Sequence, residues 1–429
     1  MELHPMRVLH LIQRYWPAPG GAELYLSHIS EHLAREGHQV TVATTDALDF
    51  ELFWEPQRRR VPEPSATHEQ VQIRRFPVRH LPLSPLAYPA IRRLLWLMSR
   101  VHPLPVSLLH RLARFTPWVP ALWQWLEQTE QPFDLVAGMT ICFEPLLEAG
   151  LRFARRRGVP YVSYPLTHLG AGPAPAQDAL SRFYTMRHQV DLVRSSDAAV
   201  VQTPAERAFY VSQGMDEASI VVAGAGINPK VVLGGDGARF REKHQIKGSL
   251  VLSLSSMSYD KGTVHTIEAV RRLWQAGRQV ELVLIGALLE PFKHYLERLP
   301  AAERQRIRVL GSVSEQEKRD ALAAAQMLVM PSRTESFGIV YLEAWLYQKP
   351  VIGARTWGVT DVIHEGHDGL LVPFGDVSAL SAAIAHLSDC PDEAAAMGTR
   401  GQEKVYREHL WSHKVSRIER LYQHLVPAS

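Results

Sequence analysis

The stretch RVLHLIQRYWPAPGGAELYLSHISEHLAREGHQVTVAT, residues 7–44, contains the pattern from which the fold is predicted. Its first six residues, Arg7–Ile12, form a short apolar run that indicates a buried strand. A Pro/Gly loop ending at Gly20 and Gly21 follows, and a helical apolar pattern then runs to about Gly37. A second strand is expected at Gln39–Thr44, so the stretch predicts one β-α-β unit.

The same alternation continues along the chain. In the first half, further strands are expected at Asp134–Gly138, Pro160–Tyr164 and Ala198–Gln202. After residue 248 the pattern restarts, with strands expected at Ser249–Ser255, Val280–Ile285, Arg308–Leu310, Met327–Met330 and Val351–Ile352, and helices at Thr263–Gln275, Glu315–Ala324 and Ile339–Tyr347. This pattern predicts an α/β protein with two Rossmann-like, doubly wound domains.

A turn-rich segment around residues 223–229 separates the two halves. We expect an N-terminal domain over 1–224, a C-terminal domain over 225–408, and a last segment over 409–429. The stretch Val405–Leu425 is predicted to be one amphipathic helix. Because ligands bind outside the carboxyl ends of parallel strands, we expect the site in a central cleft between the two domains.

Composition narrows the classes of function. The 429 residues are 46% apolar and 21% charged, with a net charge of +3. These values indicate a globular protein and give no overall nucleic-acid signal. Two cysteines, Cys142 and Cys390, are too few for a disulfide framework. No signal peptide or membrane-spanning run is evident, so we expect a cytoplasmic protein.

The charge is unevenly distributed. The segment 70–126 contains eight arginines and no Asp or Glu, and all nine lysines lie from Lys230 onward. Within this basic block, Arg92, Arg93, Trp96 and Arg100 belong to a cationic and apolar stretch. Such a stretch is suited to an anionic membrane surface or a lipid-linked acceptor, and the alternative is an ordinary helical insertion. Eight prolines in the block predict short helices.

Two glutamates eight residues apart, Glu335 and Glu343, form the most informative motif, in ESFGIVYLEA. Glu335 is expected in a strand-to-helix loop and Glu343 in the helix, so both are expected to face one site. The helix start near Phe337–Ile339 offers unpaired amides and a positive dipole end, which suit a diphosphate. The alternative is a pair of solvated carboxylates.

Three weaker features lie at similar strand-to-helix turns. Gly20 and Gly21 would let backbone amides approach an anion, although glycines are common in tight turns. Lys261 is placed to neutralise phosphate charge, or is a surface lysine. His168 would contact a sugar or assist proton transfer, or is one of many structural histidines.

These features together resemble glycosyltransferase family 4, the retaining sugar transferases of GT-B fold, over nearly the whole chain. The Glu335-x7-Glu343 motif is the family's signature. The GGAE loop, the Lys261-Gly262 pair and the Thr167-His168 turn support the resemblance. Further support comes from Gly226–Asn228, the GSVS run that starts at Gly311, Pro350-Val351 and Gly369–Val372.

The resemblance implies a nucleotide-sugar (NDP-sugar) donor and assigns roles to the site residues. Glu343 resembles the residue that holds the ribose hydroxyls, and Glu335 and His168 resemble those that contact the sugar. Lys261 and backbone amides would stabilise the diphosphate leaving group, and the base would lie near Gly311–Val313. The complete set of nucleotide-sugar contacts implied is Gly20, Gly21, Ser256, Gly311, Ser312, Val313, Ser336, Phe337, Gly338, Ile339 and Glu343, with Glu335, His168 and Lys261 as catalytic residues. No metal and no cofactor are expected.

Two positions depart from the family pattern. Ser256 stands where the family usually has an arginine, five residues before the lysine. Trp357-Gly358 replaces a common Gly-Gly pair. Both departures bear on how well this chain turns over a donor.

We therefore expect a retaining hexosyltransferase that takes a UDP- or GDP-linked sugar and a glycan or lipid-linked acceptor. The expected location is cytoplasmic, with peripheral association to the inner face of a membrane. The alternative is a catalytically impaired subunit of the same fold that binds a nucleotide sugar or a partner, and an epimerase or phosphorylase of this architecture is a weaker one. The sequence does not identify the base, the sugar, the acceptor or the oligomeric state.

Overall fold

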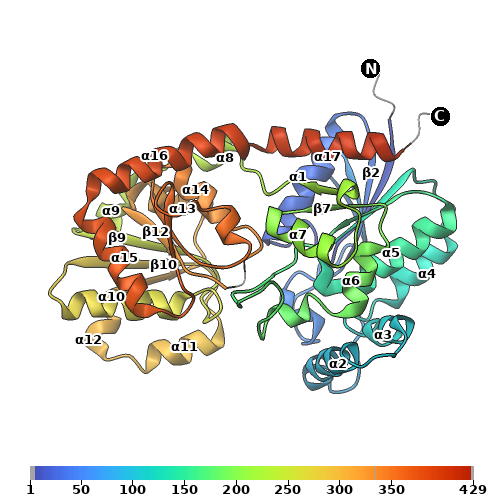
Figure 1. The fold of residues 1–429 in the computed structure, drawn as a ribbon, viewed down its shortest axis with the longest axis horizontal. Coiled ribbons are helices and arrows are strands. Elements are labelled where there is room, and N and C mark those ends of the chain that lie inside the picture. The colour runs from blue at the N-terminus through green and yellow to red at the C-terminus, as the bar shows by residue number, and fades with distance from the viewer. Residues whose placement is uncertain (1–4, 334, 427–429) are drawn as a thin grey trace. The chain divides into compact units, whose positions relative to one another are not determined.

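The computed structural model describes residues 5–333 and 335–426. Residues 1–4, Thr334 and 427–429 belong to the predicted domain ranges but lie outside the described residues. The chain forms two compact units (Figure 1). The first, unit 1, contains the described residues up to His168, Asp178–Gly224 and the chain from Lys414 onward. The second, unit 2, contains Leu169–Gln177 and Ala225–His413.

Unit 1 is built on an eight-stranded sheet with the order β3-β4-β2-β1-β5-β6-β7-β8. Neighbouring strands are parallel except for the antiparallel pair β3–β4. The strands are β1 (Arg7–Leu11), β2 (Gln39–Thr45), β3 (Ser65–His68), β4 (Val71–Phe76), β5 (Leu135–Met139), β6 (Tyr161–Tyr164), β7 (Ala198–Val201) and β8 (Ile220–Val222). The helices are α1 (Gly21–Arg35), α2 (Ser84–Ser99), α3 (Val106–Ala113), α4 (Pro120–Gln128), α5 (Glu144–Arg157), α6 (Arg187–Arg194) and α7 (Pro204–Ser212).

Unit 2 contains a six-stranded, all-parallel sheet with the order β11-β10-β9-β12-β13-β14. Its strands are β9 (Ser249–Leu254), β10 (Val280–Ile285), β11 (Ile307–Gly311), β12 (Met327–Met330), β13 (Val351–Ala354) and β14 (Gly369–Val372). Its helices are α8 (Pro229–Val232), α9 (Gly237–Lys243), α10 (Thr263–Gln275), α11 (Glu290–Glu297), α12 (Ala301–Arg304), α13 (Glu315–Ala324), α14 (Ile339–Leu346), α15 (Val377–Asp389) and α16 (Pro391–Glu408).

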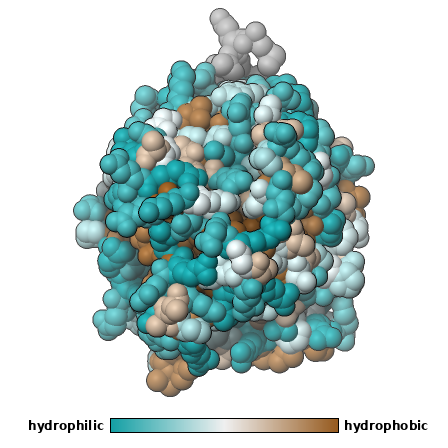
Figure 2. All heavy atoms as spheres, turned by 90° about the vertical axis from the view of Figure 1, so that its left-hand side faces the viewer, coloured by the Kyte–Doolittle hydropathy of each residue, from teal (hydrophilic) through white to brown (hydrophobic). Residues whose placement is uncertain are grey.

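The core of unit 2 explains why these segments fold as they do. The strand side chains Val251, Leu282 and Val329 are fully buried, together with Ile267 of α10 and Ile384 of α15. Continuous apolar strands buried on both faces are typical of parallel sheets covered by helices. Figure 2 shows the outer face of unit 2 over α9 and α15, which is largely hydrophilic. The expected α/β architecture with two parallel-sheet domains is therefore confirmed.

The C-terminal segment differs from the prediction of one helix over Val405–Leu425. The helix α16 ends at Glu408, and a separate helix, α17, covers Trp411–Leu425. Between them the chain pairs with Ile227, whose N–H donates to the His409 carbonyl at 2.7 Å and whose carbonyl accepts from Trp411 N at 3.2 Å. This extended pairing uses backbone groups that a continuous helix would need.

The basic block also differs from the prediction. Its first residues form β4, which pairs with β2, because Val71 and Ile73 alternate toward the core. The helix α2 has 16 residues despite Pro85 and Pro89. Pro85 lies in the first turn, where its missing N–H removes no helical bond, so the helix tolerates it. The expectation of short helices was wrong here.

Candidate active site

The site in unit 2 begins where the strand order of its sheet reverses. From β9 the chain proceeds to β10 and β11 on one side, and β12, β13 and β14 continue on the other. The loops that leave β9 and β12 therefore diverge from adjacent strands and leave a crevice at their carboxyl ends. These two loops carry Lys261 and Glu335.

Lys261 and Glu335 are in direct contact. The Lys261 ammonium donates to a carboxylate oxygen of Glu335, and the two side chains are 24% and 16% exposed. Gly262, next to Lys261, has φ +76°, and a Cβ there would lie 2.3 Å from the Pro331 carbonyl oxygen. Glycine adopts this backbone conformation at little cost, and a Cβ at this position would block the close approach of the two loops.

A second ion pair joins the same two loops. Arg333 donates to the Asp260 carboxylate at 2.6 Å, and the Arg333 N–H donates to the Asp260 carbonyl at 3.0 Å. The Arg333 guanidinium also lies over the rings of Tyr259 and Phe374, at 5.6 and 5.1 Å. Arg333 was not predicted from the sequence, although it lies two residues before Glu335. It holds the Lys261 loop against the Glu335 loop.

The turn from Ser336 to Ile339 leads into α14. Gly338 adopts φ +90°, and a Cβ there would lie 2.4 Å from the Tyr341 ring. Phe337 is 5% exposed and packs edge-on against the His409 ring, and Ser336 and Ile339 are half-buried. The Tyr341 hydroxyl donates to the Met330 carbonyl at 2.7 Å and fixes α14 to β12. The α14 N-terminus with its amides therefore starts beside Glu335.

Glu343 lies on α14 and is 9% exposed. Its carboxylate accepts a hydrogen bond from the Lys318 ammonium at 3.1 Å, and Lys318 also pairs with Glu315 at 2.9 Å. Burial raises the pKa of the Glu343 carboxyl, and the positive charge of Lys318 opposes this rise. Lys318, on α13, was not predicted from the sequence.

Gly311, Ser312 and Val313 form the turn between β11 and α13. Gly311 has φ +66°, and its carbonyl accepts from Gly286 N at 2.9 Å. Ser312 is exposed and Val313 is half-buried. This turn thus lies directly before the helix that carries Lys318.

The two departures from the family pattern lie in the same unit. Ser256 is half-buried in the loop that leaves β9. Trp357 donates from its backbone N–H to Gly170 O at 3.1 Å and from its indole to Gly172 O at 3.0 Å. A Cβ on Gly358 would lie 2.9 Å from the Glu335 carbonyl, so this glycine packs against the motif loop.

In unit 1 the strand order reverses between β1 and β5, and Gly20 and Gly21 lie between β1 and α1. A Cβ on Gly20 would lie 2.0 Å from a carboxylate oxygen of Glu23, whereas Gly21 has open space around it. Glu23 is 4% exposed and accepts from Arg14 at 2.8 Å. Burial raises the pKa of Glu23, and Arg14 opposes the rise. The turn is therefore held by a buried ion pair behind it.

His168 lies in the loop after β6 and packs edge-on against the Tyr184 ring, with 4.5 Å between centroids. The preceding residue, Thr167, donates from its N–H to Glu206 at 2.6 Å and shares a hydrogen bond with the Tyr210 hydroxyl at 2.7 Å. Glu206 is fully buried and fixes this loop.

The structure thus brings Lys261, Glu335 and the α14 N-terminus together in unit 2, with Glu343 on the same helix. It places Gly20, Gly21 and His168 in unit 1. The predicted cleft in which both sets meet one donor stays a prediction.

The four residues of the basic stretch separate into two kinds. Arg93 and Arg100 are exposed, and Trp96 is half-buried beneath the guanidinium groups of Arg100 and Arg182. Arg92 is 8% exposed and is paired with the buried Glu144. The prediction that Arg92 contacts an acceptor or a membrane surface is therefore wrong, because its guanidinium is buried and paired with Glu144 inside unit 1.

Two groups of ligand-type side chains occur elsewhere among the described residues, His364/His367/Asp368 and His386/Cys390/Glu393. In the first group, Asp368 already accepts from the Lys404 ammonium at 2.9 Å. Neither group includes a residue predicted for the donor site.

Comparison with known families identifies the class of protein. Residues 20–226 match the glycosyl transferase 4-like domain, and residues 236–404 match the glycosyl transferases of group 1. The chain therefore belongs to the group 1, family 4-like glycosyltransferases, and the family predicted from the sequence is confirmed.

Individual relatives show how far the likeness extends. The MMP α-(1→4)-mannosyltransferase of Mycolicibacterium hassiacum is 23% identical over 98% of both chains. A GDP-mannose-dependent phosphatidylinositol monomannoside mannosyltransferase of Corynebacterium glutamicum is 32% identical, over 38% of this chain and 44% of its own length.

Solved structures agree on the GT-B fold. HepE of Anabaena, determined with UDP and glucose, superposes with a TM-score of 0.71 at 19% identity, over 98% of this chain and all of its own. Sucrose-phosphate synthase of Thermosynechococcus elongatus gives a TM-score of 0.71 at 20% identity, over 99% of this chain and all of its own.

Proposed function

We propose that this protein is a retaining hexosyltransferase that uses a UDP- or GDP-linked sugar and works without a metal ion. The observation that carries the proposal is the junction of the β9 and β12 loops, where Lys261, Glu335 and the α14 N-terminus lie together. The names of two similar proteins support it, one GDP-mannose-dependent and one bound to UDP and glucose.

The chemistry of the proposed reaction follows from charge. When the bond from the sugar to the diphosphate breaks, negative charge grows on the leaving phosphate oxygen. Lys261 and the amides from Phe337 to Ile339 would stabilise this charge, a contribution of several kcal/mol in preorganised sites. The presence of the diphosphate would also give the Lys261 ammonium a second anion besides Glu335.

Retention needs no protein nucleophile in this proposal. The leaving phosphate oxygen accepts the proton of the acceptor hydroxyl while that hydroxyl attacks the same face of the sugar. Glu335 and His168 would contact the sugar, and Glu343 would accept hydrogen bonds from the ribose hydroxyls. The Gly311–Val313 turn would lie against the base.

A hydrolysis experiment tests retention and metal independence without knowledge of the acceptor. A thermal-shift comparison of UDP, GDP and ADP sugars first selects the donor, because binding to the folded state raises apparent stability. The anomer released to water is then read by proton NMR before mutarotation, in EDTA. We expect the donor's own anomer. An inverted anomer, or activity lost in EDTA and restored by Mg²⁺, contradicts the proposal. Donor binding without any turnover favours the impaired-subunit alternative, to which Ser256 points.

We further propose a glycan or lipid-linked acceptor, met at an anionic membrane surface from the cytoplasmic side. At 100° per residue, Leu86, Arg93, Leu94 and Leu97 share one face of α2, and Arg100 directly follows the helix. Leu86, Leu94 and Leu97 are 72%, 46% and 53% exposed, and the segment 70–126 contains no acidic residue. A cationic and apolar helix face of this kind suits an anionic interface. Among the described residues, no helix has the length and hydrophobicity of a membrane span.

Vesicle co-sedimentation tests the membrane proposal. We expect binding to vesicles with anionic lipid and weaker binding to neutral ones. The Leu94→Ser/Leu97→Ser variant should lose binding, whereas the Arg278→Ser variant, changed on unit 2, should retain it. Equal, negligible binding to both kinds of vesicle contradicts the proposal.

A further inference from the structure

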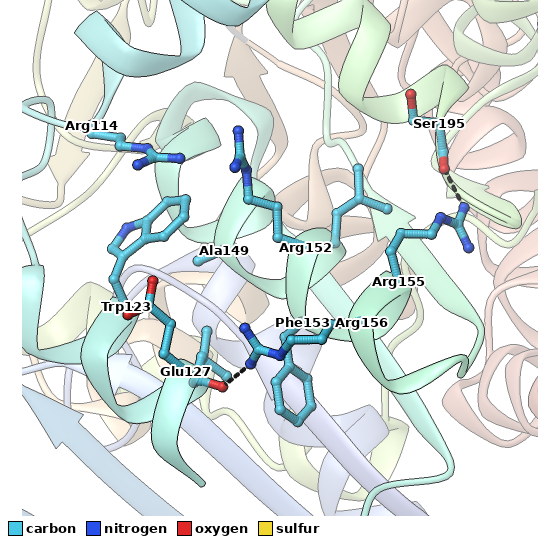
Figure 3. A pocket seen from close by; sticks show the side chains of 11 residues that line it. Arg114, Trp123, Glu127, Ala149, Arg152, Phe153, Arg155, Arg156 and Ser195 are labelled. Carbon is cyan, nitrogen blue, oxygen red and sulfur yellow. Dashed lines mark hydrogen bonds between the residues drawn. The ribbon is translucent and has the colours of Figure 1, made fainter.

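A pocket in unit 1 lies between α4 and α5 and is separate from every residue assigned above. Its volume is about 680 Å³. The lining residues include Trp123 and Glu127 of α4 and four arginines, Arg114, Arg152, Arg155 and Arg156 (Figure 3).

Within unit 1, the pocket lies toward the amino ends of the parallel strands, away from the turns that carry Gly20 and His168. The helix α5 starts after the carboxyl end of β5 and ends at Arg157, shortly before β6 begins parallel to β5. It therefore runs antiparallel to the strands, and its last turns, with Arg155 and Arg156, lie near their amino ends. The loops that carry Gly20 and His168 leave the carboxyl ends.

The arginines of this pocket outnumber the carboxylates that line it. Arg114 and Arg152 both donate to one carboxylate, Glu148, at 3.0 and 2.8 Å, and Glu148 is 4% exposed behind them. Arg156 donates to the neutral carbonyl of Leu126. The lining itself carries four guanidinium groups and one carboxylate, Glu127.

Arg155 and Trp123 complete the lining. Arg155 pairs with Asp197 at 2.7 Å and also donates to the Ser195 carbonyl. These two partners hold the Arg155 guanidinium in place. The Arg114 guanidinium stacks over the Trp123 indole at 3.9 Å, and Arg152 lies 6.0 Å from the same ring. Figure 3 shows Arg114 and Arg152 on the same side of Trp123. The pocket thus combines several guanidinium groups with an aromatic surface.

We propose that this pocket binds a phosphate monoester whose organic part lies against Trp123. A dianionic phosphate accepts hydrogen bonds from several guanidinium groups at once and matches their fork geometry. Arg152 and Arg156 are exposed and supply the donors, whereas Arg155 stays with Asp197. The ligand is either a soluble phosphorylated sugar or a lipid phosphate headgroup, which present the same group.

Isothermal titration with glucose 6-phosphate, and vesicles with and without phosphatidic acid, distinguish the two sources. We expect saturable binding of at least one probe and a loss of at least about tenfold in affinity in Arg152→Glu and Arg156→Glu, equivalent to about 1.4 kcal/mol. Arg111→Glu, an equal charge change on an exposed residue of α3 outside the pocket, should bind as the unchanged protein does. Arg152→Lys should lose part of the affinity.

The proposal is overturned if neither probe binds, or if Arg111→Glu weakens binding as much as Arg152→Glu does. Circular dichroism checks that the variants fold, and Glu148 keeps Arg114 as a partner when Arg152 is changed. Nucleotide-sugar binding in unit 2 should be unchanged in Arg152→Glu. This readout separates failure of the pocket from failure of the proposed transferase site.

Discussion

Glu343 illustrates how a neighbouring residue determines what a site residue does. A carboxylate that is 9% exposed loses most of its hydration, which favours the protonated form. Lys318 opposes this effect through a hydrogen bond of 3.1 Å, which favours the ionised form and orients the carboxylate. Within the proposed function, Lys318 therefore positions Glu343 for the ribose hydroxyls.

Replacement of Lys318 by Met is expected to raise KM for the donor about tenfold with little change in kcat, since a hydrogen bond to a charged group contributes roughly 1.5–3 kcal/mol. Without Lys318 the pKa of Glu343 rises further. Because the ionised carboxylate is the better acceptor, donor affinity should then fall at a higher pH than in the unchanged protein.

Steady-state kinetics across pH measure both effects. Lys318→Arg should restore much of the affinity, and Lys293→Met should change nothing, because Lys293 pairs with Glu290 on α11. An unchanged KM and an unchanged pH profile in Lys318→Met would rule out the positioning role.

The sequence predicted Glu335 and Glu343 of the motif and Lys261 of the β9 loop as site residues, but not the residues that hold them in place. Glu335, Glu343 and Lys261 follow from their spacing and from their places at strand ends. Arg333 and Lys318 were missed because their roles depend on contacts with Asp260 and Glu343, which lie far away in sequence or on another helix. Arg92 was misplaced for the same reason, since its partner Glu144 is 52 residues away.

At the scale of elements, short apolar runs predicted β1, β2, β5–β7 and β9–β13 closely, and the predicted Thr263–Gln275 coincides with α10. The strands β3, β4, β8 and β14 were not predicted. The elements that depend on a distant partner were not predicted. The break between α16 and α17 depends on Ile227, and β4 depends on pairing with β2 and β3.

The helix α17 is fixed to unit 1 by a buried polar cluster. His10 of β1 lies between Ser30 Oγ at 2.8 Å and the Tyr422 hydroxyl at 3.1 Å, and the Tyr422 hydroxyl also contacts that of Tyr164 at 2.8 Å. Burial lowers the pKa of His10 to about 3. The His10 imidazole is therefore neutral in the folded protein near pH 7.

This low pKa predicts an acid-sensitive contribution to stability. An unfolded histidine has a pKa of about 6.5, so the unfolded chain binds an extra proton as the pH falls from about 6.5 toward 3. The free energy of unfolding therefore decreases with falling pH over this window. His10→Gln should be less stable at pH 7 because packing is altered, but should lose about 2 kcal/mol less between about pH 7 and pH 5.

Urea unfolding at both pH values measures the difference, with His294→Gln as the exposed control. An equal loss of stability in His10→Gln and the unchanged protein would contradict the assignment.

At the scale of the whole molecule, each unit repeats one arrangement, a sheet whose strand order reverses at the pair of strands next to the candidate residues. Basic residues are distributed unevenly between the units. The segment 70–126, with eight arginines and no acidic residue, lies in unit 1, whereas all lysines except Lys414 lie in unit 2. The loops after β9 and β12 carry two cations, Lys261 beside Glu335 and Arg333 beside Asp260. The central claim is that this lysine stabilises the departing diphosphate.

The rate of donor turnover by Lys261→Ala tests that claim most directly, measured with the donor selected by thermal shift and with Lys293→Ala as the control. Loss of the main side-chain cation should reduce kcat by at least about a hundredfold, equivalent to about 2.7 kcal/mol, while the fold and the control remain intact. A Lys261→Ala protein that retains most of its kcat would contradict the account.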